Sequence, residues 1–267
     1  MYKEEVELEI RMDGRNAIIT GGSLGLGKAI ATEFTRSGAN VALVARRQET
    51  LDEAKAEIEK ENGGKVVAIA ADIRLAADCE RVVAEAEASL GAIDILVNNA
   101  GTSQRGPFLD VTDELWQDDL DLKLFASIRL CRLVIPGMRD RRWGRIINVL
   151  NVGAKMPGAE GAPTAVSRAA GMALMKVLAN EGAPHNVLVN GMLVGKIRSN
   201  QWERLHAADP RGLSLEEWYA DTGADQPMGR LGLPEEFANM ACFLASDAGS
   251  YINGAAINVD GGLCNVV

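Results

Sequence analysis

Seven short apolar runs recur along this chain, and amphipathic stretches of helix length separate them. The runs are NAIIT at 16–20, VALVA at 41–45, VVAIAA at 66–71, IDILVNNA at 93–100, GRIINVL at 144–150, NVLVNGM at 186–192 and AAINVDGG at 255–262. Most of them are continuously apolar, which is typical of strands buried on both faces. The alternation of such strands with helices is typical of βαβ units. The sequence therefore predicts an α/β protein with a doubly wound (Rossmann) seven-stranded parallel sheet and helices on both faces.

The domain organisation follows from the length and from the spacing of the runs. The predicted helices cover 25–37, 49–61, 76–89, 113–139, 166–181 and 234–246. A chain of 267 residues with 47% hydrophobic content can bury one sizeable core. We expect an N-terminal tail over residues 1–13 and a single domain over residues 14–267.

One segment, residues 195–227, is too long for a simple connection between a strand and a helix, and it is predicted to be irregular. In a doubly wound fold such an insertion usually lies over the ligand cleft. It contains Trp202, Trp218 and Tyr219. These aromatic residues could contact an apolar or ring-shaped ligand, or they could pin the insertion onto the core.

The composition excludes several classes of partner. Lys and Arg total 28 and Asp and Glu total 37, so the net charge of −9 repels nucleic-acid phosphates. No apolar run approaches the roughly 18 residues of a membrane span, and the acidic N-terminus lacks the apolar core of a signal peptide. The four cysteines form no CxxC pair, which disfavours a zinc site. We expect a cytoplasmic protein that binds a small molecule and no nucleic acid, membrane or metal.

A glycine-rich turn, TGGSLGLG at 20–27, follows the first predicted strand and opens the first predicted helix. Glycines here let bare backbone approach a pyrophosphate, and the helix N–H groups point at the negative charge. We expect this turn to bind a dinucleotide cofactor, and the residues concerned are Gly21, Ser23, Gly25, Leu26 and Gly27. A purely structural role for the turn glycines is the alternative, and polar residues at the ends of later strands argue against it.

The end of the second predicted strand indicates which dinucleotide binds. It carries Arg46 and Arg47, where an acidic residue would bind a ribose 2′-hydroxyl and a basic one would accept a 2′-phosphate. NADP(H) is therefore favoured over NAD(H). Arginines that are merely solvated, or that lie against an adenine ring, are the alternative. Asp72 after the third strand and NNAG at 98–101 after the fourth place further small or polar residues at the ligand-binding edge of the sheet.

These motifs, with VNGMLVG at 189–195 and INGAAINVDGG at 252–262, resemble those of the short-chain dehydrogenase/reductase family, and the resemblance covers residues 14–264. The resemblance implies a cofactor site in a fixed set of positions. These are Gly21, Gly25 and Gly27 at the pyrophosphate, Asp72 with Ile73 at the adenine, Asn98, Ala100 and Gly101 beneath the adenine ribose, and Val194, Gly195 and Ile197 around the nicotinamide. Val194 stands where the family usually has proline.

The same resemblance predicts an altered catalytic site. The family uses a tyrosine as general acid or base, a lysine that lowers its pKa and holds the ribose, a serine that positions the substrate oxygen, and an asparagine that supports a proton-relay water. The corresponding positions here are occupied by Thr164, Arg168, Asn151 and Lys123. None of the three tyrosines has a lysine four residues further on, so the motif is absent rather than misplaced.

The replacements change what the site can do. A threonine hydroxyl is far less acidic than a phenol and arginine stays protonated, so neither Thr164 nor Arg168 can repeat the original proton transfer unaided. Losing a positioned general acid typically costs about 10²- to 10⁴-fold in rate. Arg168 can still hold the nicotinamide ribose, because its planar fork donates several hydrogen bonds. Cofactor binding can therefore survive the change.

Three replacements for the missing proton donor can be weighed. Asn151 and Thr164 together could polarise a substrate carbonyl as neutral donors. Lys155, after the fifth strand, could reach the cleft as an ammonium acid, although a solvated loop lysine is the stronger interpretation. Lys123 could be a desolvated lysine with a depressed pKa. Its alternative is an ion pair with a nearby carboxylate of the same helix, from Asp118, Asp119 or Asp121.

Two other polar residues are expected to be structural. His185 precedes the sixth strand and should lie far from the cleft. Ser167 lies on the same helix as Thr164, and at this spacing we expect it to point elsewhere.

We expect an atypical NADP(H)-dependent oxidoreductase that acts on a small alcohol or ketone, with hydride transfer retained and proton transfer reassigned. One alternative is a catalytically inactive nucleotide-binding sensor or hetero-oligomer subunit, and another is a non-redox lyase or isomerase that uses Lys123 or Lys155 as base. The family resemblance also implies a homodimer or homotetramer, built on the helices near 113–139 and 166–181, with the C-terminal strand in a second interface.

Overall fold

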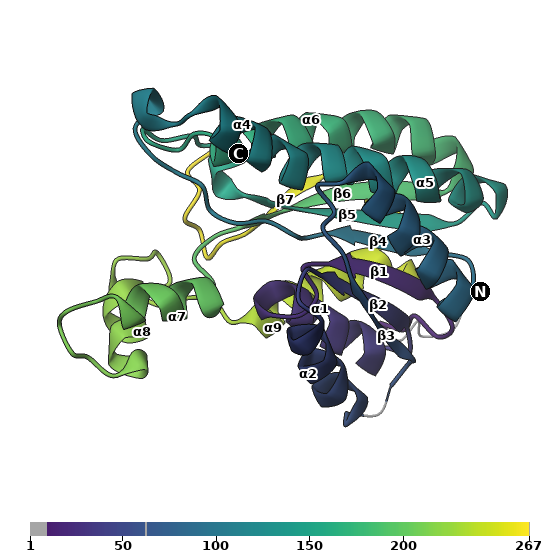
Figure 1. Ribbon diagram of the computed structural model, residues 1–267, viewed down its shortest axis with the longest axis horizontal. Coiled ribbons are helices and arrows are strands. Elements are labelled where there is room, and N and C mark those ends of the chain that lie inside the picture. The colour runs from purple at the N-terminus through teal and green to yellow at the C-terminus, as the bar shows by residue number, and fades with distance from the viewer. Residues whose placement is uncertain (1–9, 62, 267) are drawn as a thin grey trace, which may run out of the picture.

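The computed structural model describes residues 10–61 and 63–266, and these fold around one seven-stranded sheet (Figure 1). The strand order is β3-β2-β1-β4-β5-β6-β7, and every neighbouring pair is parallel. The strands are β1 Asn16–Thr20, β2 Asn40–Ala45, β3 Val66–Ala70, β4 Ile95–Asn98, β5 Gly144–Asn151, β6 Val187–Val194 and β7 Ala256–Val259. The predicted doubly wound α/β fold is confirmed.

Helices cover both faces of the sheet, as Figure 1 shows. The helices are α1 Gly25–Arg36, α2 Gln48–Glu59, α3 Ala76–Leu90, α4 Asp113–Leu120, α5 Ala126–Asp140, α6 Thr164–Gly182, α7 Asn200–Ala207, α8 Leu215–Ala224 and α9 Pro234–Ala245. Adjacent residues of β1 show why both faces are apolar: Ile18 packs into the core beneath α3, α5 and α6, and Ile19 packs into the core beneath α1, α2 and α9. Because consecutive strand side chains point to opposite faces, a strand buried on both sides must be continuously apolar.

The predicted helix at 113–139 is interrupted. A π-helical segment, Asp121–Phe125, separates α4 from α5, and Lys123 lies within it. A π-bulge adds one residue to a helical turn and is frequent at functional sites. The amphipathic pattern could not reveal it, because one extra residue barely disturbs the spacing of the apolar positions.

The predicted domain start needs a small correction. Residues 1–9 of the expected tail lie outside the described residues, but Ile10 and Met12 pack against the core, and Met12 is only 2% exposed. The Met12 backbone N–H also donates to the Ser37 carbonyl at 2.7 Å. The packed domain therefore begins by residue 10 rather than at residue 14.

The insertion at 195–227 is largely helical rather than irregular, since it forms α7 and α8, which stand apart from the body in Figure 1. Ser214 caps α8 in a reciprocal capping box with Glu217. Trp218 and Tyr219 are buried, and the Trp202 and Trp218 ring centroids lie 6.1 Å apart. These aromatic side chains pack on one another in a small cluster of their own, separate from the cores on either face of the sheet. Their role is therefore structural, but they stabilise the insertion itself rather than pin it onto the core.

No helix within residues 10–61 and 63–266 is both long enough and apolar enough to cross a membrane.

Candidate functional site

The glycine-rich turn joins β1 to α1 as a stretch of bare backbone. Gly21 has φ of 67°, and a Cβ placed on it would lie 2.8 Å from the Asn99 Nδ2 atom and 3.0 Å from the Ala100 Cα atom. A Cβ on Gly27 would collide with the Gly21 carbonyl oxygen. Gly25, with φ of 54°, opens the helix. The cradle thus fits an anionic group approaching backbone N–H groups at a helix start.

The turn is braced by polar contacts from the end of β4. Thr20 accepts hydrogen bonds from the backbone N–H groups of Asn99 at 2.9 Å and Ala100 at 3.0 Å. The Asn99 side chain donates to the Thr20 carbonyl at 2.8 Å. The sequence analysis missed Thr20 and Asn99 as bracing residues, although their positions at the ends of adjacent strands could have indicated them.

Asn98 occupies a different place from the one expected. Its side chain donates to the Asn148 Oδ1 atom at 2.9 Å and lies against the Cys131 sulfur, inside the domain. Ile73 is likewise only 6% exposed and packs in the core. The side chains of Asn98 and Ile73 are therefore buried inside the domain, and the part of these two residues in cofactor binding stays a prediction.

The end of β2 presents two exposed arginines, Arg46 and Arg47, for which no side-chain hydrogen bond is found among the described residues. Asp72 is engaged by Arg74, whose Nη2 atom lies 2.6 Å from its carboxylate. This contact lowers the pKa of Asp72. Arg74 also pairs with Asp118 at 3.2 Å. Asp72 is thus a preformed acceptor that already has a cationic partner.

The remaining predicted cofactor residues lie at the carboxyl ends of the strands or on the turn. Ser23 is buried on the turn, and Leu26 packs against the core. Val194 ends β6, and a Cβ on Gly195 would lie 2.6 Å from the Asp260 Cα atom, so this turn requires glycine. Ile197 is 5% exposed and pairs with Gly232.

Lys123 lies at the centre of the predicted catalytic set. Its side chain is fully buried together with that of Asp119, and its Nζ atom pairs with Asp119 and donates to the Thr164 hydroxyl at 2.7 Å. Burial, and then the nearby Arg168 guanidinium, lower the pKa of Lys123 to about 8, while Asp119 opposes that shift. Both interpretations of Lys123 hold at once, since it is a desolvated lysine and also one half of an ion pair.

Thr164 begins α6 and is 4% exposed. Its hydroxyl donates to the Gln104 carbonyl at 2.7 Å and accepts from Lys123 and from the Gln104 backbone N–H at 3.0 Å. The single hydroxyl proton is therefore already used. This corrects the prediction that Thr164 polarises a substrate carbonyl as a free donor.

Ser167 also differs from its prediction. Its hydroxyl donates to the Asp119 Oδ2 atom at 2.6 Å, and the Thr164 hydroxyl lies 3.4 Å from the Oδ1 atom of the same carboxylate. Residues three apart on a helix lie on neighbouring positions of one face, so the two side chains converge rather than diverge.

Arg168 lies one turn further along α6, and its Nη1 atom donates to the Val149 carbonyl at 2.7 Å. A Cβ on the exposed Gly101 would collide with the Arg168 Nη2 atom and would lie 3.6 Å from the Lys123 Cε atom. Burial lowers the pKa of Arg168 to about 10, which keeps it cationic at neutral pH. The exposed Gly101 thus lies in close contact with the Arg168 side chain and near that of Lys123.

The three remaining candidates, Asn151, Lys155 and His185, lie in different surroundings. Asn151 ends β5, and its buried Oδ1 atom has no hydrogen-bond partner among the described residues. Lys155 is neither in the cleft nor a solvated loop lysine, because its partly buried ammonium donates to the Ala256 carbonyl at 3.0 Å. His185 lies just before β6, at the opposite end of the strands from the site, as expected.

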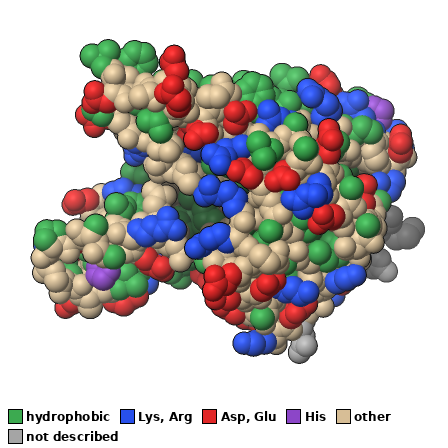
Figure 2. Space-filling view, viewed as in Figure 1, with side chains coloured by type: hydrophobic (Ala, Val, Ile, Leu, Met, Phe, Trp, Pro, Cys, Tyr) green, Lys and Arg blue, Asp and Glu red, His purple; other side chains and the backbone are tan. Residues whose placement is uncertain are grey.

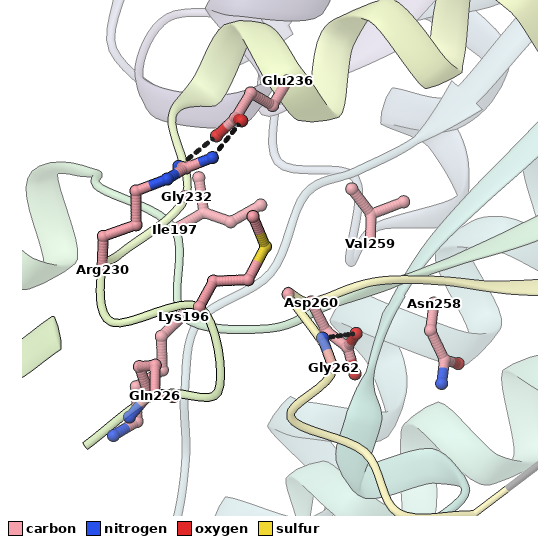
Figure 3. A pocket seen from close by; sticks show the side chains of 12 residues that line it. Lys196, Ile197, Gln226, Arg230, Gly232, Glu236, Asn258, Val259, Asp260 and Gly262 are labelled. Carbon is pink, nitrogen blue, oxygen red and sulfur yellow. Dashed lines mark hydrogen bonds and ion pairs between the residues drawn. The ribbon is translucent and has the colours of Figure 1, made fainter. Parts of the chain in front are cut away.

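Two pockets touch predicted cofactor residues, one at Gly25 and the other at Ile197. A cleft of about 540 Å³ separates α1 from the insertion and reaches Gly25, Lys28 and Arg198. In Figure 2 Lys and Arg side chains gather around a hollow between the insertion and the body. A second pocket of about 380 Å³ lies past β7 (Figure 3), where Lys196 and Gln226 extend to the same side. Neither pocket is lined by the buried catalytic candidates Lys123, Thr164 and Arg168.

Comparison with known proteins assigns this site to a family. A family model described as enoyl-(acyl carrier protein) reductase matches residues 21–264. The chain belongs to the short-chain dehydrogenase/reductase family. Human dehydrogenase/reductase SDR family member 4 is 34% identical over 247 residues, which are 92% of this chain and 86% of the relative. This family member is therefore an NAD(P)-dependent short-chain oxidoreductase by sequence and fold.

Two solved structures are similar over nearly the whole chain. L-Sorbose reductase from Gluconobacter frateurii, complexed with NADPH and L-sorbose, superposes with a TM-score of 0.92 at 34% identity and covers 97% of this chain and 100% of that one. A short-chain oxidoreductase from Pseudomonas aeruginosa, described as containing an atypical catalytic center, superposes with a TM-score of 0.91 at 34% identity. That match covers 96% of this chain and 100% of the other.

Proposed function

We propose that this protein is an atypical NADP(H)-dependent oxidoreductase for a small alcohol or ketone, in which Lys123 replaces tyrosine as the group that holds the transferred proton. The observation that carries the proposal is the buried Lys123 ammonium, fixed by Asp119 and Thr164 beneath Gly101 and beside Arg168. The similar oxidoreductase described as containing an atypical catalytic center supports the idea that this fold accommodates a changed catalytic site.

The cofactor preference rests on charge. The exposed Arg46 and Arg47 offer two guanidinium groups where a 2′-phosphate would lie, and the end of β2 carries no acidic residue. The similar L-sorbose reductase is described with NADPH. When bound, NADPH would supply hydride to the substrate. The turn at Gly21, Gly25 and Gly27 would hold the pyrophosphate, and Arg168 would hold the nicotinamide ribose.

The chain's own residues would manage the proton. With a pKa of about 8, Lys123 is mostly protonated at neutral pH yet far more acidic than an ordinary lysine. Two of its three N–H groups are used by Asp119 and Thr164 among the described residues, which leaves one for a substrate oxygen or a bridging water. In the reductive direction the Lys123 Nζ atom gives a proton to the developing alkoxide, and in the oxidative direction it accepts one.

Asn151 would position the substrate. Its amide makes no hydrogen bond within the described residues, and its buried oxygen is costly to leave unpaired. A substrate hydroxyl at the end of β5 could donate to this oxygen, whereas a substrate carbonyl could accept only from the amide nitrogen of Asn151. By the family resemblance, Asn151 occupies the position of the serine that orients the substrate oxygen. Asn151 would keep a polar contact to the substrate there, through an amide instead of a hydroxyl.

The oligomer would form through the helices that resemblance implies. Apolar side chains on α4, α5, α6 and the π-helical segment stay exposed, and they are Leu115, Phe125, Leu133, Val166 and Val177. Covering such side chains is a common reason for a symmetric helix-to-helix interface. Size-exclusion chromatography with light scattering on the purified protein tests for a dimer or tetramer.

The proposed function is tested by titrating the protein with NADPH and NADH by fluorescence and then measuring cofactor oxidation and reduction across a panel of small ketones and alcohols. We expect tighter NADPH binding and measurable turnover. Binding without turnover across the panel would favour a nucleotide sensor or an inactive subunit. Substrate conversion without any change in the cofactor would favour a lyase or isomerase with Lys123 as base.

A further inference from the structure

Asp119 is a buried carboxylate enclosed by donors from two elements. It lies on α4 with only 2% of its surface exposed. Lys123 of the π-helical segment pairs with its Oδ1 atom, and the Thr164 hydroxyl lies 3.4 Å from that oxygen. Ser167 of α6 donates to its Oδ2 atom at 2.6 Å. Both carboxylate oxygens are therefore held, and the side chain has one fixed orientation.

Asp119 of α4 and Lys123 of the π-helical segment lie on one face of the interrupted helix. Asp119 precedes Lys123 by four residues, the spacing at which helical side chains meet. Both point toward the start of α6, where Thr164 and Ser167 project from adjacent positions of one helix face. A Cβ on the exposed Gly101 would lie 3.6 Å from the Lys123 Cε atom, so the lysine side chain passes directly beneath this glycine.

We infer that Asp119 is a positioning residue for the proposed reaction: it holds the buried Lys123 ammonium in one orientation against the start of α6 and opposes the loss of its proton. This inference rests on the proposed function, because it acts through Lys123. It assigns to Asp119 a role distinct from cofactor binding and from contact with substrate.

The charges around Lys123 act in opposite directions. Arg168 of α6 and the loss of hydration favour the neutral amine, whereas Asp119 of α4 favours the ammonium. Thr164 and Ser167 are the neutral polar groups of the same cluster, and no further charged side chain contacts the Lys123 amine among residues 10–61 and 63–266. Removing the Asp119 charge leaves the two terms that disfavour the ammonium unopposed. Lys123 must then lose its proton at a lower pH.

The pH profile of reductive turnover tests this assignment with Asp119→Asn, which keeps the shape of the side chain and removes its charge. Reduction requires the protonated lysine, so the rate falls as pH rises through the Lys123 pKa. We expect this fall to move down by about 1–3 pH units in Asp119→Asn. On the affected limb each unit corresponds to about a tenfold loss of rate at fixed pH.

Asp118→Asn is the matched control, because Asp118 is the neighbouring carboxylate, its side chain is 61% exposed, and it pairs with Arg74 rather than with Lys123. Its profile should coincide with that of the wild type. Asp119→Glu restores the charge and should bring the limb back toward the wild-type position. An unmoved limb in Asp119→Asn, or an equal shift in Asp118→Asn, would overturn the inference.

A second readout separates this inference from the proposed function. In protein labelled with ¹³C-lysine, the Lys123 Cε resonance reports protonation directly and is assigned by its absence in Lys123→Arg. We expect its titration midpoint to be lower in Asp119→Asn than in the wild type, with or without substrate turnover. The same midpoint in both proteins would refute the role of Asp119, whereas an absence of turnover in the wild type would refute only the proposed function.

Discussion

Replacing Lys123 by methionine is expected to destabilise the protein strongly. Removing the charge of Asp119 as well is expected to recover most of the lost stability. Both side chains are fully buried, so Lys123→Met leaves a carboxylate without its cation. Breaking a buried ion pair by removing one partner costs about 3–5 kcal/mol, because the remaining charge is uncompensated or must take up a proton. The free energy of unfolding of the single variant should fall by that amount.

The double variant Lys123→Met with Asp119→Leu removes both charges and keeps the volume. Replacing a buried pair by apolar residues of similar size is often close to neutral. Ser167 loses its acceptor on Asp119 but can still donate to the Thr164 carbonyl, which lies 3.1 Å away. We therefore expect the double variant to lie within about 1–2 kcal/mol of the wild type, the remaining cost being the weakened hydrogen bonds of Ser167 and Thr164.

Urea unfolding followed by circular dichroism measures these differences as shifts of the midpoint at constant slope. Asp118→Asn is again the control, and as an exposed charge it should change stability by less than about 1 kcal/mol. Asp119→Leu alone is measured beside Lys123→Met alone. A loss in the double variant equal to the sum of these two single losses would mean that the two charges are not coupled, contrary to the expectation.

The remaining predictions concern the cofactor and the proton. Gly27→Ala should weaken NADPH binding at least about tenfold, because its Cβ would collide with the Gly21 backbone carbonyl of the cradle. The control Gly158→Ala, whose Cβ would have no neighbour within 4 Å, should bind NADPH as the wild type does. Equal affinities of the two variants by fluorescence titration would count against the cradle as the pyrophosphate site. Arg46→Ala with Arg47→Ala should reduce NADPH affinity about tenfold and leave NADH affinity unchanged, and a parallel loss for both nucleotides would argue against a 2′-phosphate contact. In the wild type, reductive turnover should fall and oxidative turnover should rise as the pH rises through about 8, because the pKa of Lys123 is lowered to about 8. Turnover rates that do not change between pH 7 and 9 would be inconsistent with Lys123 as the acid.

The apolar runs predicted the sheet well because a parallel strand buried on both faces has little freedom in sequence. All seven strands lie where they were expected, within about three residues at each end. The cradle was equally predictable from the sequence, because the close contacts that require glycine at Gly21 and Gly27 arise in and around the turn itself. Constraints of this kind act between residues that are close in the sequence, so the sequence reveals them.

The polar network was harder to predict because it depends on side chains that meet only in three dimensions. Asn98 and Asn99 are adjacent, yet one faces the interior and the other braces the cradle, and the strand pattern alone does not say where β4 ends. The sequence could not show that the Thr164 hydroxyl donates to the Gln104 carbonyl, because the two residues are 60 positions apart and meet only in the fold. The interrupted helix likewise could not be foreseen, and it is what brings Lys123 to Thr164.

Steady-state reduction by Lys123→Met, measured beside its affinity for NADPH, tests most directly the claim that Lys123 supplies the proton. The account predicts that NADPH still binds within about threefold of the wild type, since Arg168 and the glycine cradle are untouched, while kcat falls about 10²- to 10⁴-fold and loses its dependence on pH near 8. A folded Lys123→Met protein that retains both the wild-type kcat and the wild-type pH profile would contradict it.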